Sequence, residues 1–184
     1  MPFAPDVVEA LGAAVALANS AEPPETLGSV EALRAFYDTW GYTGVKPATA
    51  ADLDAVRAIR PRLRELLTAD RDDAVILINA ILAEQRALPQ LVRHDHLDWH
   101  IHAISPDRPM DQRIQVETAM AMIDVVRADE MSRLQACSAR DCDGIVLDLS
   151  RNRSRRFCST TCGNREAQAA FRARRAGVDL SAGA

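Results

Sequence analysis

Aromatic residues and lysine are scarce in this chain. Aromatics make up 4% of its 184 residues, and Lys46 is the only lysine among 22 basic residues. The proportions of hydrophobic residues (48%) and charged residues (26%) are those of a soluble globular protein. With so few aromatics, the core must consist mostly of Ala, Leu, Ile and Val, which favours helices. The length fits one domain, or one domain with a small appendage.

Long hydrophobic runs are also missing. The apolar run from Ala10 to Ala18 is too short to cross a bilayer, and no Lys or Arg precedes Arg34, so the run lacks the basic segment of a secretory signal. We therefore expect a cytoplasmic protein with no membrane partner. The chain contains no Gly-rich phosphate loop, Ser-His-Asp elbow or His-based zinc motif, so we expect no enzymatic activity.

Charge is unevenly distributed. Residues 137–176 contain nine Arg against four acidic residues, whereas residues 1–136 contain 13 basic and 21 acidic residues. Such asymmetry is expected where a small basic module is attached to a larger domain with a different role. We place the helical domain at 1–135, the basic module at 136–176 and a flexible tail at 177–184.

All the cysteines lie in the basic module, as two close pairs: Cys137 with Cys142, and Cys158 with Cys162. Two such pairs separated by a finger-sized loop predict one tetrahedral Zn²⁺ site with four thiolate ligands. Four thiolates leave no open position for water or substrate, so the ion would be structural. Two disulfides, or four unrelated buried thiols, are the alternatives; a reducing compartment disfavours the first and the clustering disfavours the second.

The segment around these cysteines has the pattern of a treble clef. Residues 141–144 read as a turn after a long helix, and 145–149 as a strand. A polar turn at 150–154 would bring 155–158 back as the second strand of a hairpin. A helix capped by Ser159, Thr160 or Thr161 would then run to about Ala176, with Cys162 in its first turn.

The four residues Cys162-Gly163-Asn164-Arg165 resemble the motif that names the CGNR zinc finger. Basic stretches at 150–156 and 172–175 flank it, as in that family. The front of the chain resembles the ABATE domain that precedes such fingers in bacterial proteins, through Leu17 to Ser20, 33–40 and 77–82. In that family the first helix tends to end in Asn-Thr, so Ser20 is a departure. The resemblance implies a stress-induced transcription regulator.

The basic residues of the module predict contact with nucleic acid, because guanidinium groups form bidentate hydrogen bonds with phosphate. Asn164 would read a base edge or, as we favour, form a hydrogen bond within the finger. The alternative is a solvated charged face, partly paired with the acidic domain. The candidate residues are Arg151, Arg153, Arg155, Arg156, Asn164, Arg165, Arg172, Arg174 and Arg175.

Apolar residues recur every three or four positions along five segments of the first domain, which predicts helices over 6–19, 29–40, 49–69, 72–84 and 111–135. Thr49 and Asp52 have the spacing of a capping box, and Pro61 predicts a kink in the third helix. A hypothesis from residue type alone places a small ligand, or an enzyme's substrate, near Asn19, Ser20, Arg62 and Asn79.

All four histidines, His94, His96, His100 and His102, fall in one segment with a period of two. The alternation predicts a half-buried strand paired with 88–93, with Trp99, Ile101 and Ala103 on its other face. We favour a solvent-exposed histidine face without a ligand. The alternative is a second metal site or a pH-sensing patch.

Together these patterns predict a mainly α protein: a helical domain with one small β-hairpin, joined by a continuous helix to a treble-clef-like zinc finger. The preferred function is a zinc-dependent, DNA-binding transcription regulator whose helical domain senses a small-molecule effector or forms a homodimer. The alternatives are a zinc-stabilised module that binds RNA or protein, and a small-molecule enzyme.

Overall fold

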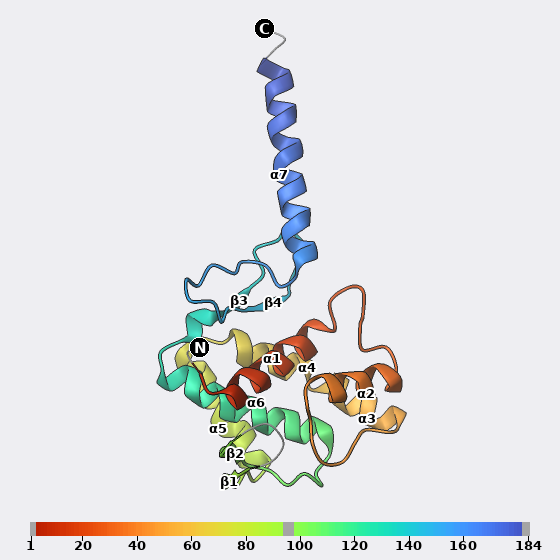
Figure 1. The fold of residues 1–184 in the computed structure, drawn as a ribbon, viewed down its shortest axis with the longest axis vertical. Coiled ribbons are helices and arrows are strands. Elements are labelled where there is room, and N and C mark those ends of the chain that lie inside the picture. Colours follow the sequence, from red (N-terminus) through yellow and green to blue (C-terminus); the bar gives the residue numbers. More distant parts are fainter. Residues whose placement is uncertain (1–2, 94–97, 182–184) are drawn as a thin grey trace.

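The structure is a computed structural model that describes residues 3–93 and 98–181, with side chains described as far as 175. Six helices form the body of the molecule, and the seventh projects away from it (Figure 1). The body consists of α1 (Pro5–Asn19), α2 (Val30–Thr39), α3 (Ala50–Ala58), α4 (Arg60–Thr68), α5 (Arg71–Glu84) and α6 (Met110–Arg127). The predicted helical domain is therefore confirmed.

Local signals in the sequence set the helix boundaries. Thr49 and Asp52 form the predicted capping box at the start of α3. Ser29 caps α2 and Asp70 caps α5, each by accepting a backbone N–H three residues on. The predicted kink at Pro61 is a break, because α3 ends at Ala58 and α4 starts at Arg60 with the proline in its first turn.

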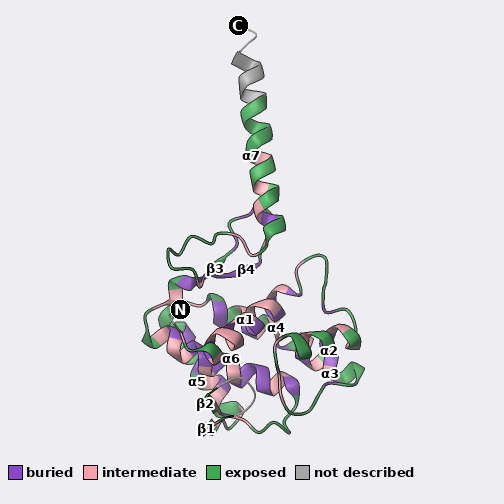
Figure 2. Ribbon diagram, in the orientation of Figure 1, coloured by how far each residue is buried: buried purple, intermediate pink, exposed green. Residues whose placement is uncertain are grey.

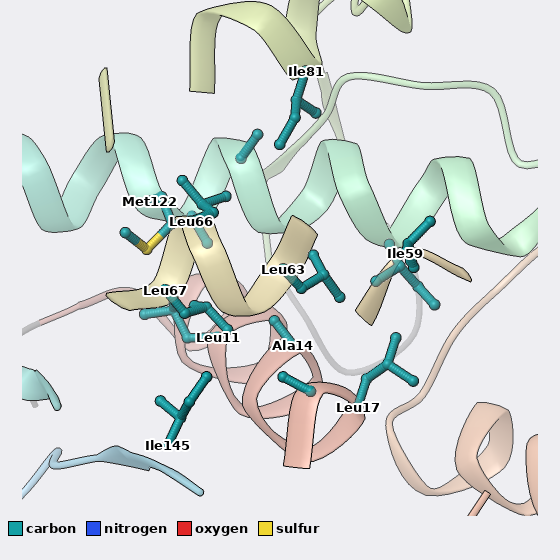
Figure 3. Packing of buried hydrophobic residues seen from close by; sticks show 14 of the residues in the cluster. Leu11, Ala14, Leu17, Ile59, Leu63, Leu66, Leu67, Ile81, Met122 and Ile145 are labelled. Carbon is teal, nitrogen blue, oxygen red and sulfur yellow. The ribbon is translucent and has the colours of Figure 1, made fainter. Parts of the chain in front are cut away.

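The hydrophobic core surrounds α1, which packs against α4 and α6, while α5 covers the other side of α6 (Figure 3). Its aliphatic side chains are buried almost completely, as predicted for a chain poor in aromatics. They include Leu11, Ala14 and Leu17 of α1, Leu63, Leu66 and Leu67 of α4, Ile81 of α5 and Met122 of α6.

The link to the basic module differs from the prediction. Helix α6 ends at Arg127 instead of continuing to 135, and Asp129 reverses the chain with φ 56°. A 3₁₀ turn (Met131–Arg133) leads directly into strand β3 (Leu134–Ala136). No continuous helix joins the two parts, because the left-handed residue stops the α-helix.

A second correction concerns the hairpin of the module. Strand β4 (Ile145–Leu147) pairs antiparallel with β3, and not with 155–158. The carboxylate of Asp148 accepts the backbone N–H of Ser150 and of Arg155, at 2.8 and 2.7 Å. These bonds close the 148–155 loop and occupy the Arg155 N–H that a ladder with β4 would need. The module thus has the predicted hairpin, but 134–136 takes the place of 155–158 as the partner of β4.

Strand β4 is shared between two hydrophobic clusters. Ile145 and Leu147 belong to the core of the helical body, whereas Val146 packs with Cys137, Ala139 and Cys162. All three β4 residues are buried, and Figure 3 shows Ile145 below Leu11 of α1. Because side chains alternate along a strand, one strand holds the module onto the body.

The other hairpin lies at the far end of the body and reverses the predicted faces at 99–101, while Ala103 is buried as predicted. Strand β1 (Gln90–Val92) pairs with β2 (His100–His102). Trp99 is 63% exposed and His100 only 6% exposed, so the predicted wet histidine face is wrong at His100. Burial of His100 is tolerated because its Nδ1 lies 2.8 Å from the Asp98 carbonyl and its Nε2 3.1 Å from Nε2 of His102. His94 and His96 lie outside the described residues.

Helix α7 (Thr160–Ser181) extends from the module into solvent and is exposed along most of its described length (Figure 2). It continues past the predicted end near 176, so the predicted tail at 177–184 begins inside this helix.

Candidate metal centre and nucleic-acid interface

The four cysteines converge on one point. Cys137 follows β3, Cys142 lies in the turn before β4, Cys158 precedes α7 and Cys162 lies in the first turn of α7. Their Sγ atoms all lie within 4.8 Å of one another. Cys142 and Cys158 are 3.6 Å apart, and Cys158 and Cys162 3.7 Å apart.

These separations fit a tetrahedral zinc ion. Four sulfurs at about 2.3 Å from one ion would be about 3.8 Å from each other. The same distances are far above the ~2.05 Å of a disulfide, and all four cysteines are free. The cluster is a zinc-binding site, and its four thiolates make it structural.

The backbone around the site leaves no room for larger residues. The Cys137 N–H donates to the Gly144 carbonyl at 2.7 Å and closes the turn that carries Cys142. A Cβ atom on Gly144 would lie 2.8 Å from the Cys158 Sγ, so only glycine fits there. The space at Gly163 is less restricted, since a Cβ atom there would lie 3.3 Å from the Phe157 ring.

Burial raises the pKa of the Cys142 and Cys158 thiols. A thiolate at either position is therefore costly unless a cation compensates its charge. A zinc ion supplies that charge, and so metal binding and folding of the module are coupled.

Three polar side chains of the body or the link hold the module in place. Asn19 donates to the Ile145 carbonyl at 2.8 Å and accepts the Ile145 N–H at 2.7 Å. Arg64 donates to the Asp143 carbonyl, and Arg133 donates to the Asp148 carbonyl at 3.0 Å. These contacts could not be predicted from the sequence, because a side chain that binds a backbone group far along the chain has no local signature.

The predicted ligand corner does not come together. Asn19 binds β4, and Ser20 is buried between the Leu17 carbonyl and Arg60. Arg62 forms a two-pronged ion pair with Glu84, and Asn79 is exposed on α5. None of the four lines the cavity between α1, α6 and β2.

Three of the predicted nucleic-acid residues make contacts within the protein. Arg153 pairs with Glu130 at 2.8 Å, and Arg155 donates to the carbonyls of Phe157 and Cys158. Arg165 donates to the Arg140 carbonyl at 3.0 Å. The contacts within the protein therefore explain part of why arginine occurs at these three positions.

The other predicted residues are exposed and have no hydrogen bond or ion pair from their side chains to any described residue. Two of them lie over a ring, Arg156 on Phe157 and Arg175 on Phe171. Asn164 is exposed too, so the favoured hydrogen bond within the finger is absent from the described contacts. The group consists of Arg151, Arg156, Asn164, Arg172, Arg174 and Arg175.

Comparison with known protein families gives two matches in the order that the fold suggests. Residues 133–175 match the CGNR zinc finger, and residues 11–129 match ABATE, described as "Putative stress-induced transcription regulator". The chain belongs to the ABATE family. Its two matched segments meet where α6 ends and β3 begins. No curated protein matched the chain.

The family matches agree with the resemblance in the sequence, to a CGNR zinc finger preceded by an ABATE domain. Within 3–93 and 98–181, no helix combines the length and the apolar composition needed to cross a bilayer.

Proposed function

We propose that this ABATE protein is a zinc-dependent transcription regulator that binds duplex DNA through the exposed basic surface of its finger. The observation that carries the proposal is the set of arginines on α7. Arg172 and Arg174 have no partner among the described residues, while the helix projects away from the acidic body (Figure 1).

The shape and charge of α7 suit a nucleic-acid backbone. At 22 residues the helix is about 33 Å long, and the major groove of B-DNA admits an α-helix. Arginines at 172, 174 and 175 point in different directions around the axis, so they can reach phosphates on both sides of a groove. Asn164, exposed at the fifth position of α7, is the candidate for contact with a base edge.

The helical body then has the regulatory role, in the cytoplasm. It would respond to a stress-related effector or form a homodimer. The exposed apolar face of the β1–β2 hairpin supports the second role, because Leu91 and Ile101 form a cross-strand pair and are 68% and 46% exposed, next to Trp99. This face lies at the far end of the body from α7 (Figure 1).

Fluorescence anisotropy with the zinc-loaded full chain tests the proposal. Labelled duplex DNA, single-stranded DNA and structured RNA would be compared, with and without a chelator. We expect binding to the duplex that is lost on zinc removal. Tighter binding to RNA would favour an RNA module, and no binding to any of the three would favour a protein-interaction module.

A further inference from the structure

The four cysteines of the zinc site differ in their exposure to solvent. Cys137 and Cys162 are buried, whereas Cys142 and Cys158 are only half-buried. The Sγ atoms of the two half-buried cysteines are 3.6 Å apart. Oxidants attack accessible thiolates, while buried structural cysteines are inert. The site therefore contains one accessible pair of sulfurs and one protected pair.

Hydrogen bonds to the sulfurs divide them in a similar way. The Cys137 Sγ accepts the Cys158 N–H at 3.4 Å, and the Cys162 Sγ accepts an N–H of Arg165 at 3.9 Å. No described residue donates an N–H to the Sγ of Cys158. An N–H donor stabilises the charge of a thiolate and so lowers its nucleophilicity. We therefore expect Cys158, which is accessible and has no such donor, to react first with an oxidant.

We propose that the zinc site is a redox switch in which a hydroperoxide oxidises Cys158 and Cys142 to a disulfide. The Cys158 thiolate attacks a peroxide oxygen, the O–O bond breaks and hydroxide leaves, so that a sulfenic acid forms. The Cys142 thiolate then attacks the Cys158 sulfur, the S–O bond breaks and a second hydroxide leaves as the disulfide forms. The two sulfurs give two electrons to the peroxide.

The structure favours Cys142 over Cys162 as the partner of Cys158. The Cys162 Sγ is also near, at 3.7 Å, but it is buried in the first turn of α7 and accepts the N–H of Arg165. Gly144 places no side chain beside the accessible pair, since a Cβ atom there would lie 2.8 Å from the Cys158 Sγ and 3.3 Å from the Cys142 Sγ. The two sulfurs therefore have room to approach to the ~2.05 Å of a disulfide.

Oxidation would uncouple α7 from the helical body. The disulfide removes two of the four ligands that a structural zinc ion needs, so the site no longer holds its ion. On one side of the site, the segment around the start of β4 is held to the body by Asn19 and Arg64. On the other side, the start of α7 contacts the module through exposed hydrogen bonds of Arg140 with Glu166 and Arg165. Without zinc, α7 would lose its fixed position.

The switch gives the proposed regulator a signal, because a finger without zinc would not hold α7 in place for DNA. This effect on DNA rests on the proposed function. The disulfide and the release of zinc do not, because both are measured without DNA. A reductant would reverse the disulfide, as expected of a regulatory rather than a damaging oxidation.

Zinc release from the full chain under hydrogen peroxide tests the proposal. A chromogenic chelator records the release, and mass spectrometry after differential alkylation identifies the oxidised cysteines. We expect peroxide in molar excess to release zinc at least about fivefold faster than the chelator alone, with Cys142–Cys158 as the first disulfide. A thiol reductant with added zinc should reverse both changes.

The decisive variant is Cys158→His, because imidazole is also a zinc ligand but forms no disulfide. Once its zinc content has been measured, peroxide should release zinc from it at least about fivefold more slowly than from the wild type. Ser138→Ala, at an exposed serine next to Cys137, should release zinc at the wild-type rate. If Cys158→His does not take up zinc, the disulfide map of the wild type decides alone.

A first disulfide between any other pair of cysteines, or a zinc site that withstands peroxide, would overturn the proposal. Fluorescence anisotropy with duplex DNA tests the effect on binding, and we expect the oxidised chain to bind at least about tenfold more weakly than the reduced chain. Equal binding by the two forms would contradict a regulatory switch. No binding by the reduced chain would contradict the proposed function, while the disulfide map and the zinc release would still decide the redox chemistry.

Discussion

Several arginines of the helical body and two arginines of α7, Arg172 and Arg174, have opposite environments. In the body, Arg60 pairs with Glu25, Arg62 pairs with Glu84, and Arg113 donates to three backbone carbonyls. On α7, Arg172 and Arg174 have no partner among described residues. Arginine therefore stabilises the fold in the body and is available for an outside partner on α7. The contacts of each arginine, and not the number of arginines in a region, indicate its role.

The finger itself lies between these extremes. Its metal site and hairpin are integrated with the body through Ile145 and Asn19, whereas the start of its last helix is held by the module itself, where Arg165 donates to the Arg140 carbonyl. Cutting or weakening contacts in each region should therefore have very different effects.

The largest effect is expected for the metal. Structural zinc contributes on the order of 10 kcal/mol to the folding of such modules. Cys158→Ser should unfold 137–175, and because Ile145 and Leu147 are part of the body's core, it should also lower the melting temperature of the helical body. Hydrogen exchange and calorimetry measure both; Ser138→Ala, at an exposed serine next to the ligand Cys137, is the control. An unchanged body would mean that the finger is an independent unit.

The next largest effect is expected for the two hydrogen bonds between Asn19 of α1 and Ile145 of β4. Asn19→Ala leaves the backbone N–H and carbonyl of the buried Ile145 unpaired and should cost about 2–4 kcal/mol of unfolding free energy. Asn79→Ala, at an exposed position of α5, should cost less than about 0.5 kcal/mol. Urea unfolding measures both values. Similar losses of unfolding free energy in the two variants would contradict a special role of Asn19 in holding β4.

Glu117 extends the comparison to a buried acidic residue of the helical body. Its pKa in the folded state is about 7, above the ordinary value near 4.5, so the folded protein loses stability as pH rises from about 4.5 through 7. Glu117→Gln should raise the unfolding free energy by about 1–2 kcal/mol at pH 8 and by much less at pH 5. Chemical denaturation at the two pH values gives the difference; a gain independent of pH would contradict the burial of an ionised carboxyl.

The smallest effects concern single arginines of the finger. Arg153→Ala breaks a half-exposed pair with Glu130 and should cost about 0.5 kcal/mol. Arg172→Ala breaks no described contact, so its unfolding free energy should match the wild type within about 0.3 kcal/mol. A measurable loss at Arg172 would show a structural contact there.

Much of the fold could be predicted because its signals are local. The capping box at 49 and 52, the proline at 61 and the spacing of apolar residues predicted the helices of the body, and the cysteine spacing predicted the metal site. Each depends on residues a few positions apart.

The errors arose where the outcome depends on one side chain's partner, on one backbone conformation or on a distant contact. The strand partner of 145–147 depends on where Asp148 directs its carboxylate, and the end of α6 depends on one left-handed residue, Asp129. The inverted histidine strand has the right period but the wrong face, because period alone does not say which side meets the body. Asn19 was noticed for its type, but its partner is 126 residues away.

A salt series of duplex DNA binding tests the central claim most directly. Four to six arginine–phosphate contacts predict a slope of log affinity against log salt of roughly −4 to −5, at about −0.9 per phosphate. The triple variant Arg172→Ala, Arg174→Ala, Arg175→Ala should reduce the slope by about 3, whereas Arg153→Ala, whose guanidinium is paired with Glu130, should leave it nearly unchanged. Equal slopes for the wild type and the triple variant would contradict DNA binding through α7.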